Sequence, residues 1–241
     1  MAALDTVSET ARTYEPDRYL SALYAPEPAR TNLIALAAFH AEMGRISTTV
    51  REPLLIEIRL QWWRDTLDRL RDGAMSGHPV ADSLAEPLRA GVLPPGLLLG
   101  MIDATANQRP LADWTDPKAL RAHCVKLHGA VFALAARCLG AQHSSDLEVA
   151  TQRAGEAYGL ARLLVAANPI AAELRVATIA RCLSAHTEAM RAVARLDSAL
   201  GPGFLPLAMV PTYANAAPGA EISPLRRWWR LWRAQLSGRL D

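Results

Sequence analysis

Apolar residues recur at steps of three and four along most of this chain, and this spacing constrains the fold more than any other feature. Between about residues 27 and 44, Leu33, Leu36, Ala37 and Met43 fall on one broad helical face. No window shows a sustained two-residue alternation. Aromatic residues make up only 6% of the chain, whereas strands are usually rich in aromatic and β-branched side chains. The sequence therefore predicts an all-α protein with almost no sheet.

Prolines, glycines and capping residues divide the chain into about ten predicted helices. Pro16 and Pro53 suit first helical turns, Asp116 and Ser223 suit N-caps, and Gly140 suits a C-cap. The predicted helices cover about residues 14–24, 27–44, 53–72, 80–89, 95–106, 117–139, 146–167, 171–200, 202–213 and 225–236.

The length of 241 residues suits one large helical domain. We therefore expect a single-domain helical bundle over residues 14–241, preceded by a flexible N-terminus over residues 1–13. The net charge is +2, which is too close to balance to indicate a nucleic-acid partner.

Cysteine content and hydropathy indicate a cytoplasmic location with at most peripheral membrane contact. The three cysteines contain no CxxC pair and are odd in number, which suits a reducing compartment. Residues 1–13 contain Asp5 and Glu9 and lack the apolar run of a signal peptide. The longest apolar stretches, such as residues 91–102, contain prolines and fall short of the ~20 residues that a membrane span requires.

Two groups of residues are candidate metal ligands, and each also has a structural interpretation. Glu42 lies one turn from Arg45, and an ion pair between them is the simpler reading. Cys124 and His128 lie four residues apart on one helix face and could bind zinc, but a structural zinc site needs about four ligands and the sequence shows no second cluster. Core packing is the alternative for Cys124 and His128.

The segment around residues 57–64 allows two interpretations. In the first, Ile58, Trp62 and neighbouring leucines fill the core, while Glu57 and Arg64 tie adjacent helices together. In the second, the segment forms a pocket wall or a partner surface, because tryptophan and arginine are favoured at binding hot spots. The candidate residues for a pocket or partner surface are Phe39, Glu42, Arg59, Trp62 and Trp63.

The last predicted helix is basic and amphipathic. Its candidate membrane-contact residues are Arg226, Arg227, Trp228, Trp229, Arg230, Trp232 and Arg233. One side of this helix carries Leu225, Trp228 or Trp229, Trp232 and Leu236. This pattern is typical of helices that lie on a membrane surface or dock on a partner. The alternative is a terminal helix that packs its tryptophans on the domain and exposes its arginines.

Several segments resemble the squalene/phytoene synthase family. The resemblance spans about residues 14–236 and is carried by Arg18–Pro26, Leu36–Phe39, Val50–Asp65, Cys124–Ala130, Arg137–Gly140, Gly155–Leu160 and Leu205–Tyr213. It implies an α-helical isoprenoid-synthase fold in which two aspartate-rich motifs on facing helices hold magnesium ions. Those ions offset the charge that develops as a prenyl diphosphate ionises.

Neither aspartate-rich motif is preserved when the chain is aligned on this pattern. The first motif falls on Ala41, Gly44, Arg45 and Thr48, and the second falls on Gly159, Arg162, Ala166 and Ile170. The chain also lacks the Arg-Gly-x-x-Tyr-x-Pro loop that family members insert after the second motif. We therefore expect no catalytic residues and no metal cofactor.

The lost aspartates make the chain similar to the non-synthase branch that includes the mitochondrial assembly factor of respiratory complex I. This resemblance implies a non-catalytic role in protein assembly or lipid binding, isoprenoids included, at the inner membrane. The partner would be a membrane surface or a membrane-associated protein. The first alternative is a magnesium-dependent prenyl-diphosphate transferase, acting alone or with a partner subunit that supplies the aspartates. A second alternative is a helical scaffold that binds neither lipid nor membrane.

Overall fold

The structure is a computed structural model that describes residues 2–49, 52–108, 113–167, 170 and 172–238. Helices account for most of this part of the chain, and no strand occurs within it. The all-α prediction is therefore confirmed. Within the same residues, no helix combines the length and the apolar character needed to cross a bilayer.

The chain divides into two compact units. Unit 1 comprises Met1–Gln108 and Leu134–Ala141, and unit 2 comprises Arg109–Ala133 and Gln142–Asp241. The boundary between the two units falls within α9 (Ala130–Cys138). The single domain expected from residue 14 onward stays a prediction.

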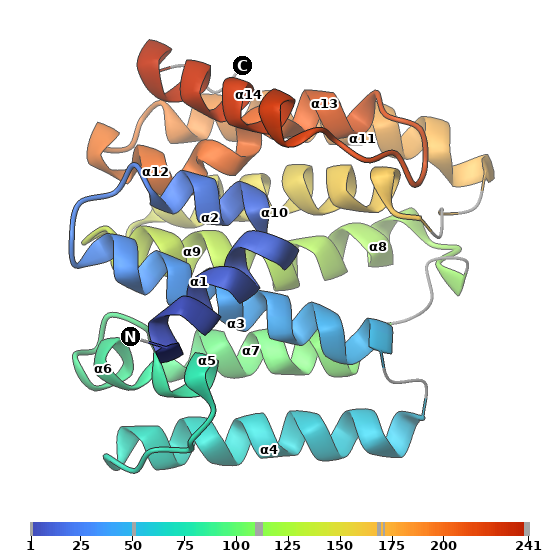
Figure 1. Cartoon of the computed structure of the whole chain (residues 1–241). Coiled ribbons are helices and arrows are strands. Elements are labelled where there is room, and N and C mark those ends of the chain that lie inside the picture. The colour runs from blue at the N-terminus through green and yellow to red at the C-terminus, as the bar shows by residue number, and fades with distance from the viewer. Residues whose placement is uncertain (1, 50–51, 109–112, 168–169, 171, 239–241) are drawn as a thin grey trace. The chain divides into compact units, whose positions relative to one another are not determined.

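Unit 1 is built around α3 (Ala29–Thr49), which contacts α1 (Ala2–Tyr14), α2 (Pro16–Ala22) and α7 (Pro95–Ala106). The side chains of Leu36, Phe39 and Met43 on α3 are almost fully buried. In Figure 1, α7 runs between α3 and α4 (Pro53–Arg71). Two short helices, α5 (Pro79–Asp82) and α6 (Ala85–Arg89), pack against α4, where the sequence predicted one helix.

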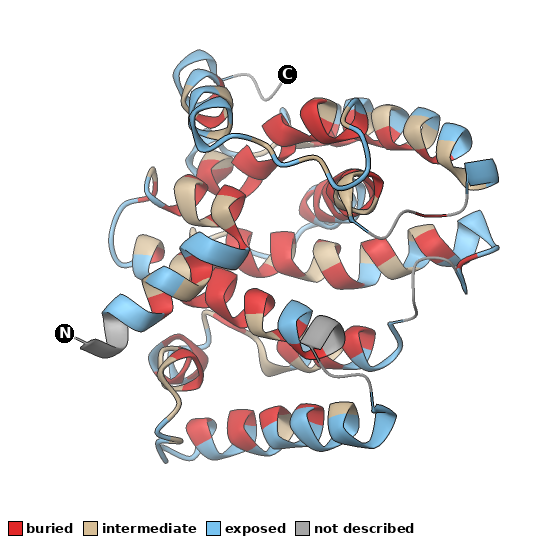
Figure 2. Ribbon diagram, turned by 45° about the vertical axis from the view of Figure 1, so that its right-hand side comes forward, coloured by how far each residue is buried: buried red, intermediate tan, exposed pale blue. Residues whose placement is uncertain are grey.

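The N-terminal segment that we expected to be flexible forms helix α1 instead. Val7 and Ala11 lie one turn apart, and both are buried. This four-residue spacing gives the segment an apolar stripe, and α1 uses it to pack against α3. The polar residues Asp5, Glu9 and Arg12 occupy the outer side of the helix, which is exposed in Figure 2.

Unit 2 is built around α10 (Ser145–Val165), whose middle turns are buried on all sides. It packs against α11 (Ala172–Val193) and α13 (Val210–Ala214). The last helix, α14 (Pro224–Ser237), packs against a 3₁₀ segment, η4 (Leu205–Met209). A second 3₁₀ segment, η3 (Ser198–Leu200), and α12 (Gly201–Phe204) precede η4. The helix predicted to reach residue 200 therefore ends at Val193.

The long helix predicted over residues 117–139 is interrupted by a π-helical turn. It consists of α8 (Pro117–Cys124), the π segment η2 (Val125–Gly129) and α9. At η2 the chain crosses α10 so closely that a Cβ at Gly155 would overlap the backbone of Gly129. Glycine at residue 155 permits this approach, and the close approach accompanies the wider helical turn.

Candidate functional site

The first predicted motif falls on the C-terminal half of α3, at Ala41, Gly44, Arg45 and Thr48. Ala41 is buried and Gly44 is exposed, while Thr48 lies outside the described side chains. Arg45 Nη1 donates a hydrogen bond to Glu42 Oε1 at 2.7 Å, and the guanidinium lies 5.0 Å from the centre of the Tyr14 ring. The ion pair predicted between Glu42 and Arg45 is confirmed.

The second predicted motif falls at the end of α10 and beyond it, at Gly159, Arg162, Ala166 and Ile170. A Cβ at Gly159 would lie 2.7 Å from Cys124 Cβ and 2.7 Å from His128 Cδ2, so this position has no space for a longer side chain. The guanidinium of Arg162 lies 6.0 Å from the centre of the Tyr158 ring. Ala166 caps the helix, and Ile170 is buried.

Magnesium in proteins is held by oxygen ligands, mainly carboxylates. The eight aligned positions contain no carboxylate, and Arg45 and Arg162 add positive charge there. Within the described residues, no group of three or more His, Cys, Asp or Glu side chains is arranged to hold a metal ion. The residues at these positions therefore do not fit a magnesium ion.

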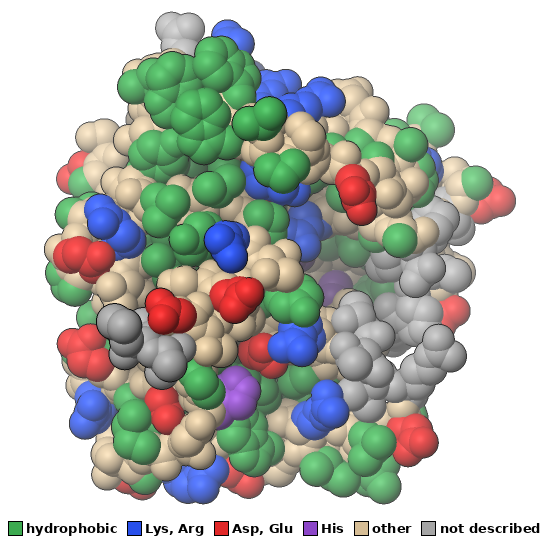
Figure 3. All heavy atoms as spheres, in the orientation of Figure 1, with side chains coloured by type: hydrophobic (Ala, Val, Ile, Leu, Met, Phe, Trp, Pro, Cys, Tyr) green, Lys and Arg blue, Asp and Glu red, His purple; other side chains and the backbone are tan. Residues whose placement is uncertain are grey.

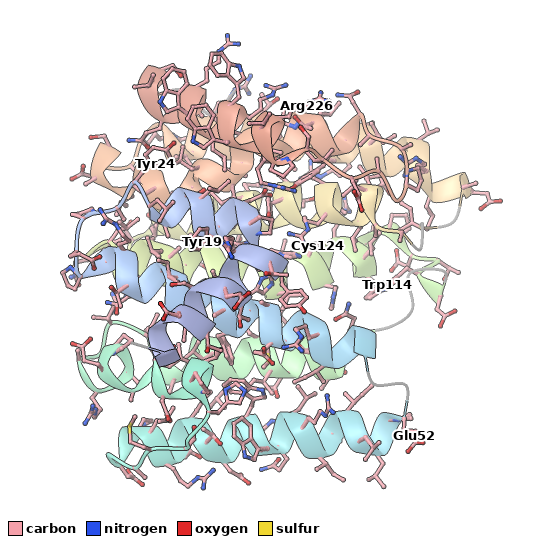
Figure 4. The ribbon with its side chains drawn as sticks, in the orientation of Figure 1. Tyr19, Tyr24, Glu52, Trp114, Cys124 and Arg226 are labelled. Carbon is pink, nitrogen blue, oxygen red and sulfur yellow. The ribbon has the colours of Figure 1, made fainter. Side chains whose placement is uncertain are left out.

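Cys124 and His128 pack against α10 at its contact with Gly159. Cys124, labelled in Figure 4, is fully buried, and burial raises the pKa of its thiol, with smaller contributions from the nearby Glu156 and Cys182. His128 lies edge-on to the Tyr158 ring, with ring centres 5.8 Å apart. These contacts agree with the packing interpretation of the two residues.

Two clusters of charged side chains, each around a buried glutamate, were not predicted from the sequence. In unit 1, Glu15 lies 3.3 Å from His40 Nδ1 and 3.4 Å from Arg18 Nε, and all three side chains are at most 7% exposed. This cluster joins α2 to α3. An acid followed by a base three residues later is the only local signal for it, and such spacing is equally common on exposed helix faces.

In unit 2, a second cluster joins α10 to α11. Arg181 donates to both carboxylate oxygens of Glu156 at 2.6 Å and to Glu188 Oε1 at 2.9 Å. Arg153 lies 3.3 Å from Glu156 and 3.2 Å from Glu188. Hydrogen bonding to Arg181 lowers the pKa of Glu188. Glu156 and Arg181 are separated by 25 residues, so local spacing gives no signal for their pairing.

Helix α4 buries one face and exposes a second apolar face. Trp63 is buried and meets Phe39 edge-on, with ring centres 5.1 Å apart. Ile58 is 55% exposed and Trp62 is 36% exposed, so the first interpretation, in which both fill the core, is wrong. The sequence could not assign the faces, because apolar residues occur on most of the circumference of α4. Arg59 lies on the exposed side.

Glu57 and Arg64, which we expected to tie adjacent helices together, do so only through Arg64. Arg64 Nη1 lies 2.8 Å from Glu57 Oε1 within α4, and Arg64 Nη2 lies 3.1 Å from Asp103 Oδ1 on α7. Arg64 therefore links α4 to α7, while Glu57 stays on α4.

Helix α14 attaches to unit 2 through a narrow face and leaves its tryptophans outside. Leu231 and Ala234 are buried. Trp228 and Trp229 are 46% and 51% exposed, and both contact the Trp232 ring, with ring centres 5.6 and 5.1 Å apart. Figure 3 shows the resulting apolar patch over α14, with basic side chains beside it. The alternative interpretation, in which the tryptophans pack on the domain, does not hold for Trp228 and Trp229.

The apolar patch of α14 consists of Leu225, Trp228, Trp229, Trp232 and Leu236. The basic side chains beside it are Arg226, Arg230 and Arg233, none of which has an ion-pair partner within the described part of the chain. Figure 4 labels Arg226 near the start of α14. Ser223 caps the helix by accepting a hydrogen bond from the Arg226 amide at 3.2 Å. Both the cap and the amphipathic pattern agree with those predicted from the sequence.

Comparison with known proteins places this geometry in a family. Residues 11–168 match the squalene/phytoene synthase family. Two solved structures share the fold. The first is squalene synthase HpnC from Alicyclobacillus acidocaldarius, with a TM-score of 0.70 and 13% identity, and the match covers 98% of this chain and 94% of that chain. The second is a dehydrosqualene synthase in complex with a ligand, with a TM-score of 0.72 and 12% identity, and the match covers 98% of this chain and 96% of that chain.

Three curated proteins are similar in sequence. The chain is 21% identical to the complex I assembly factor 6 homolog of Dictyostelium discoideum over 159 residues, 66% of this chain and 45% of that protein. It is 24% identical to assembly factor 6 of Homo sapiens over 158 residues, 65% and 46% of the two chains. It is 30% identical to that of Bos taurus over 95 residues, 39% and 28% of the two chains. Each match thus spans less than half of the relative.

The matched region begins in α1 and ends after α10, so it includes the whole first motif segment and the second motif as far as Ala166. The solved structures extend the similarity in fold to nearly the whole chain. The chain belongs to the squalene/phytoene synthase family.

Proposed function

We propose that this protein is a non-catalytic member of its family that assists the assembly of a membrane-bound protein complex, and that it binds the anionic surface of that membrane through α14. The observation that carries this proposal is the exposed apolar patch of α14, which lies beside three arginines. The curated relatives are named as assembly factors of NADH dehydrogenase (ubiquinone) complex I. We infer a cytoplasmic protein that acts at the inner membrane.

The amphipathic character of α14 suits a membrane interface. Leu225 is 80% exposed and Leu236 is 67% exposed, and the indoles between them prefer the headgroup region. Because Leu231 and Ala234 already attach α14 to unit 2, the apolar patch can enter the interface without unfolding of the helix. An arginine near an anionic surface adds about 1 kcal/mol. The arginines and the apolar patch of α14 would therefore both favour binding to an anionic membrane surface.

The non-catalytic part of the proposal is supported by the residues at the two aligned motifs. Arg45 is a cation held by Glu42, and Gly159 lies against Cys124 and His128 without space for a side chain. Diphosphate ionisation in an apolar cavity needs hard cations with carboxylate ligands. Neither motif offers such ligands.

Liposome flotation tests the membrane proposal. The full-length chain is compared with Leu225→Ser/Trp229→Ser, which alters only exposed side chains, and with Arg226→Gln/Arg230→Gln/Arg233→Gln. A chain that ends at Glu221 gives the complete loss of α14. We expect the full-length chain to float with anionic vesicles, and the triple arginine variant to bind more weakly by roughly 10- to 100-fold.

Salt and lipid charge provide the internal controls. Binding should weaken at high salt, because exposed charges are screened over about 8 Å at physiological ionic strength. Val176→Asp, at a 77% exposed position on α11, is the matched control and should float like the unmodified chain. Equal flotation of all variants, or no flotation of the full-length chain with anionic vesicles, contradicts membrane binding through α14.

A prenyl-diphosphate transferase is the second candidate, because the fold is shared with squalene synthases over 98% of the chain. Incubation with farnesyl and geranylgeranyl diphosphate plus magnesium, followed by mass spectrometry, distinguishes the two. We expect no product and no release of diphosphate. A product that disappears when a chelator is added would overturn the non-catalytic proposal.

A further inference from the structure

Helix α4 has an exposed apolar stripe that the proposed function does not use. The stripe consists of Leu54, Leu55, Ile58 and Trp62, which are 72%, 45%, 55% and 36% exposed. These positions recur at steps of three and four, so they form one continuous strip over about two turns. In Figure 3, hydrophobic side chains gather at the lower right, over the N-terminal end of α4. A contiguous apolar area of this kind is typical of an interaction site.

The stripe is held rigidly on unit 1. Trp62 lies edge-on to Trp63 and to His78, with ring centres 5.1 and 5.5 Å apart. Trp63 is buried, and Arg64 connects α4 to Asp103 on α7. A partner would therefore meet a preformed surface, and binding would cost little ordering of side chains.

Opposite charges flank the stripe. Glu57 and Arg59 lie about 100° to either side of Ile58 around the helix. Arg59 is exposed and has no ion-pair partner among the described residues. Glu57 uses Oε1 for Arg64, which leaves Oε2 to accept a second hydrogen bond. One edge of the stripe thus offers an acceptor and the other edge offers a cation.

We propose that the stripe is the contact between two copies of this chain, with the two α4 helices side by side and running in the same direction. A two-fold axis parallel to the helices places the Glu57 edge of each copy beside the Arg59 edge of the other, so the charge contact forms twice. The opposite direction places Glu57 beside Glu57 and Arg59 beside Arg59. Charge complementarity therefore selects the parallel arrangement, which pairs Leu54, Ile58 and Trp62 with the same residues of the second copy.

The stripe is short for a stable dimer. Stable interfaces bury about 1,200–2,000 Å² in total, whereas two turns of one helix from each copy cover less. A contact of this size suits a weak, transient dimer, whose population rises with protein concentration.

Sedimentation velocity of the full chain over a range of concentrations tests self-association. All measurements use a Trp228→Ser/Trp229→Ser background, so that the α14 patch cannot contribute. We expect a monomer–dimer equilibrium that Ile58→Asp weakens by at least about tenfold, and that Arg59→Glu weakens several-fold in low salt. Val176→Asp, at a 77% exposed position on α11, is the matched control and should leave the equilibrium unchanged. Circular dichroism verifies that each variant is folded.

Disulfide crosslinking tests the direction of the two helices. Leu54→Cys should crosslink to itself under oxidising conditions, because the parallel arrangement places Leu54 beside the same residue of the second copy. In an antiparallel pair centred on Ile58, the two Leu54 positions are about 12 Å apart along the helix axis, too far for a disulfide. Val176→Cys serves as the control for random collision, and the three native cysteines are buried.

Three outcomes overturn the proposal. The first is a monomer at every concentration. The second is a dimer that Ile58→Asp leaves intact or that Val176→Asp weakens equally. The third is crosslinking at Ile58→Cys without crosslinking at Leu54→Cys, which excludes the parallel direction.

Discussion

Replacement of Arg181 by methionine should destabilise unit 2 more than any other single loss of charge in the α10–α11 contact. The Arg181 guanidinium holds both oxygens of Glu156 at 2.6 Å, and the Glu156 side chain is only 6% exposed. Methionine keeps much of the packing volume but removes the charge that compensates Glu156. A buried carboxylate then remains, with only Arg153 nearby at 3.3 Å.

The expected cost follows from the burial of the two partners. Removal of one partner from a buried ion pair typically costs about 3–5 kcal/mol. The Arg181 side chain is 26% exposed, so water partly screens the pair, and we expect about 2–3 kcal/mol. In a domain of this size, each kcal/mol lowers Tm by about 2–4 °C. Arg181→Met should therefore lower Tm by about 8 °C.

Urea denaturation followed by circular dichroism measures this loss, with Glu188→Gln as the comparison. The Glu188 side chain is 33% exposed, so its loss should cost no more than about 1 kcal/mol. The double variant Glu156→Leu/Arg181→Met should recover most of the stability, because no uncompensated charge stays buried. A loss below about 0.5 kcal/mol for Arg181→Met, or a double variant that loses the sum of both single changes, would refute this reasoning.

The same network predicts an acid-dependent loss of stability. Hydrogen bonding to Arg181 lowers the pKa of Glu188 below its usual value of 4.5. A carboxylate whose pKa is lowered by folding stabilises the folded state above its unfolded pKa, and this contribution is lost as pH falls through the folded pKa. The stability difference between the unmodified chain and Glu188→Gln should therefore shrink as pH falls from about 5 to about 3.

Three further predictions concern packing. Gly155→Ala should lower the free energy of unfolding, measured by urea denaturation, by about 3 kcal/mol or more, because the added Cβ overlaps the backbone of Gly129. As the control, Gly100→Ala adds a Cβ that meets no atom within 4 Å, so it should be neutral or stabilising by up to about 1 kcal/mol. Val7→Asp should cost about 3 kcal/mol and speed proteolysis of α1, since Val7 is 4% exposed; unchanged proteolysis would support a flexible N-terminus. Burial raises the pKa of the Cys138 and Cys182 thiols to about 12, and it also raises the pKa of the Cys124 thiol. Thiol reagents at about pH 8 should therefore modify the protein only after it unfolds.

Much of the helical architecture could be predicted from the sequence, because local chemistry decides it. Asp116 accepts a hydrogen bond from the Lys118 amide at the start of α8, and Gly140 adopts a φ of 88° after α9. Pro53 and Pro224 stand in first turns. Each signal acts within four residues of the chain, so no tertiary contact is needed to interpret it.

Only the tertiary structure decided which apolar residues are buried and where the charges meet. On α4 and α14, apolar residues cover most of the circumference, so the position of the neighbouring helix selects Trp63 and Leu231 for the interior and leaves Trp62 and Trp229 at the surface. The Glu156–Arg181 pair joins residues 25 positions apart. The sequence determines the period of each helix, whereas burial depends on which elements lie against it, and that depends on the packing of the whole unit.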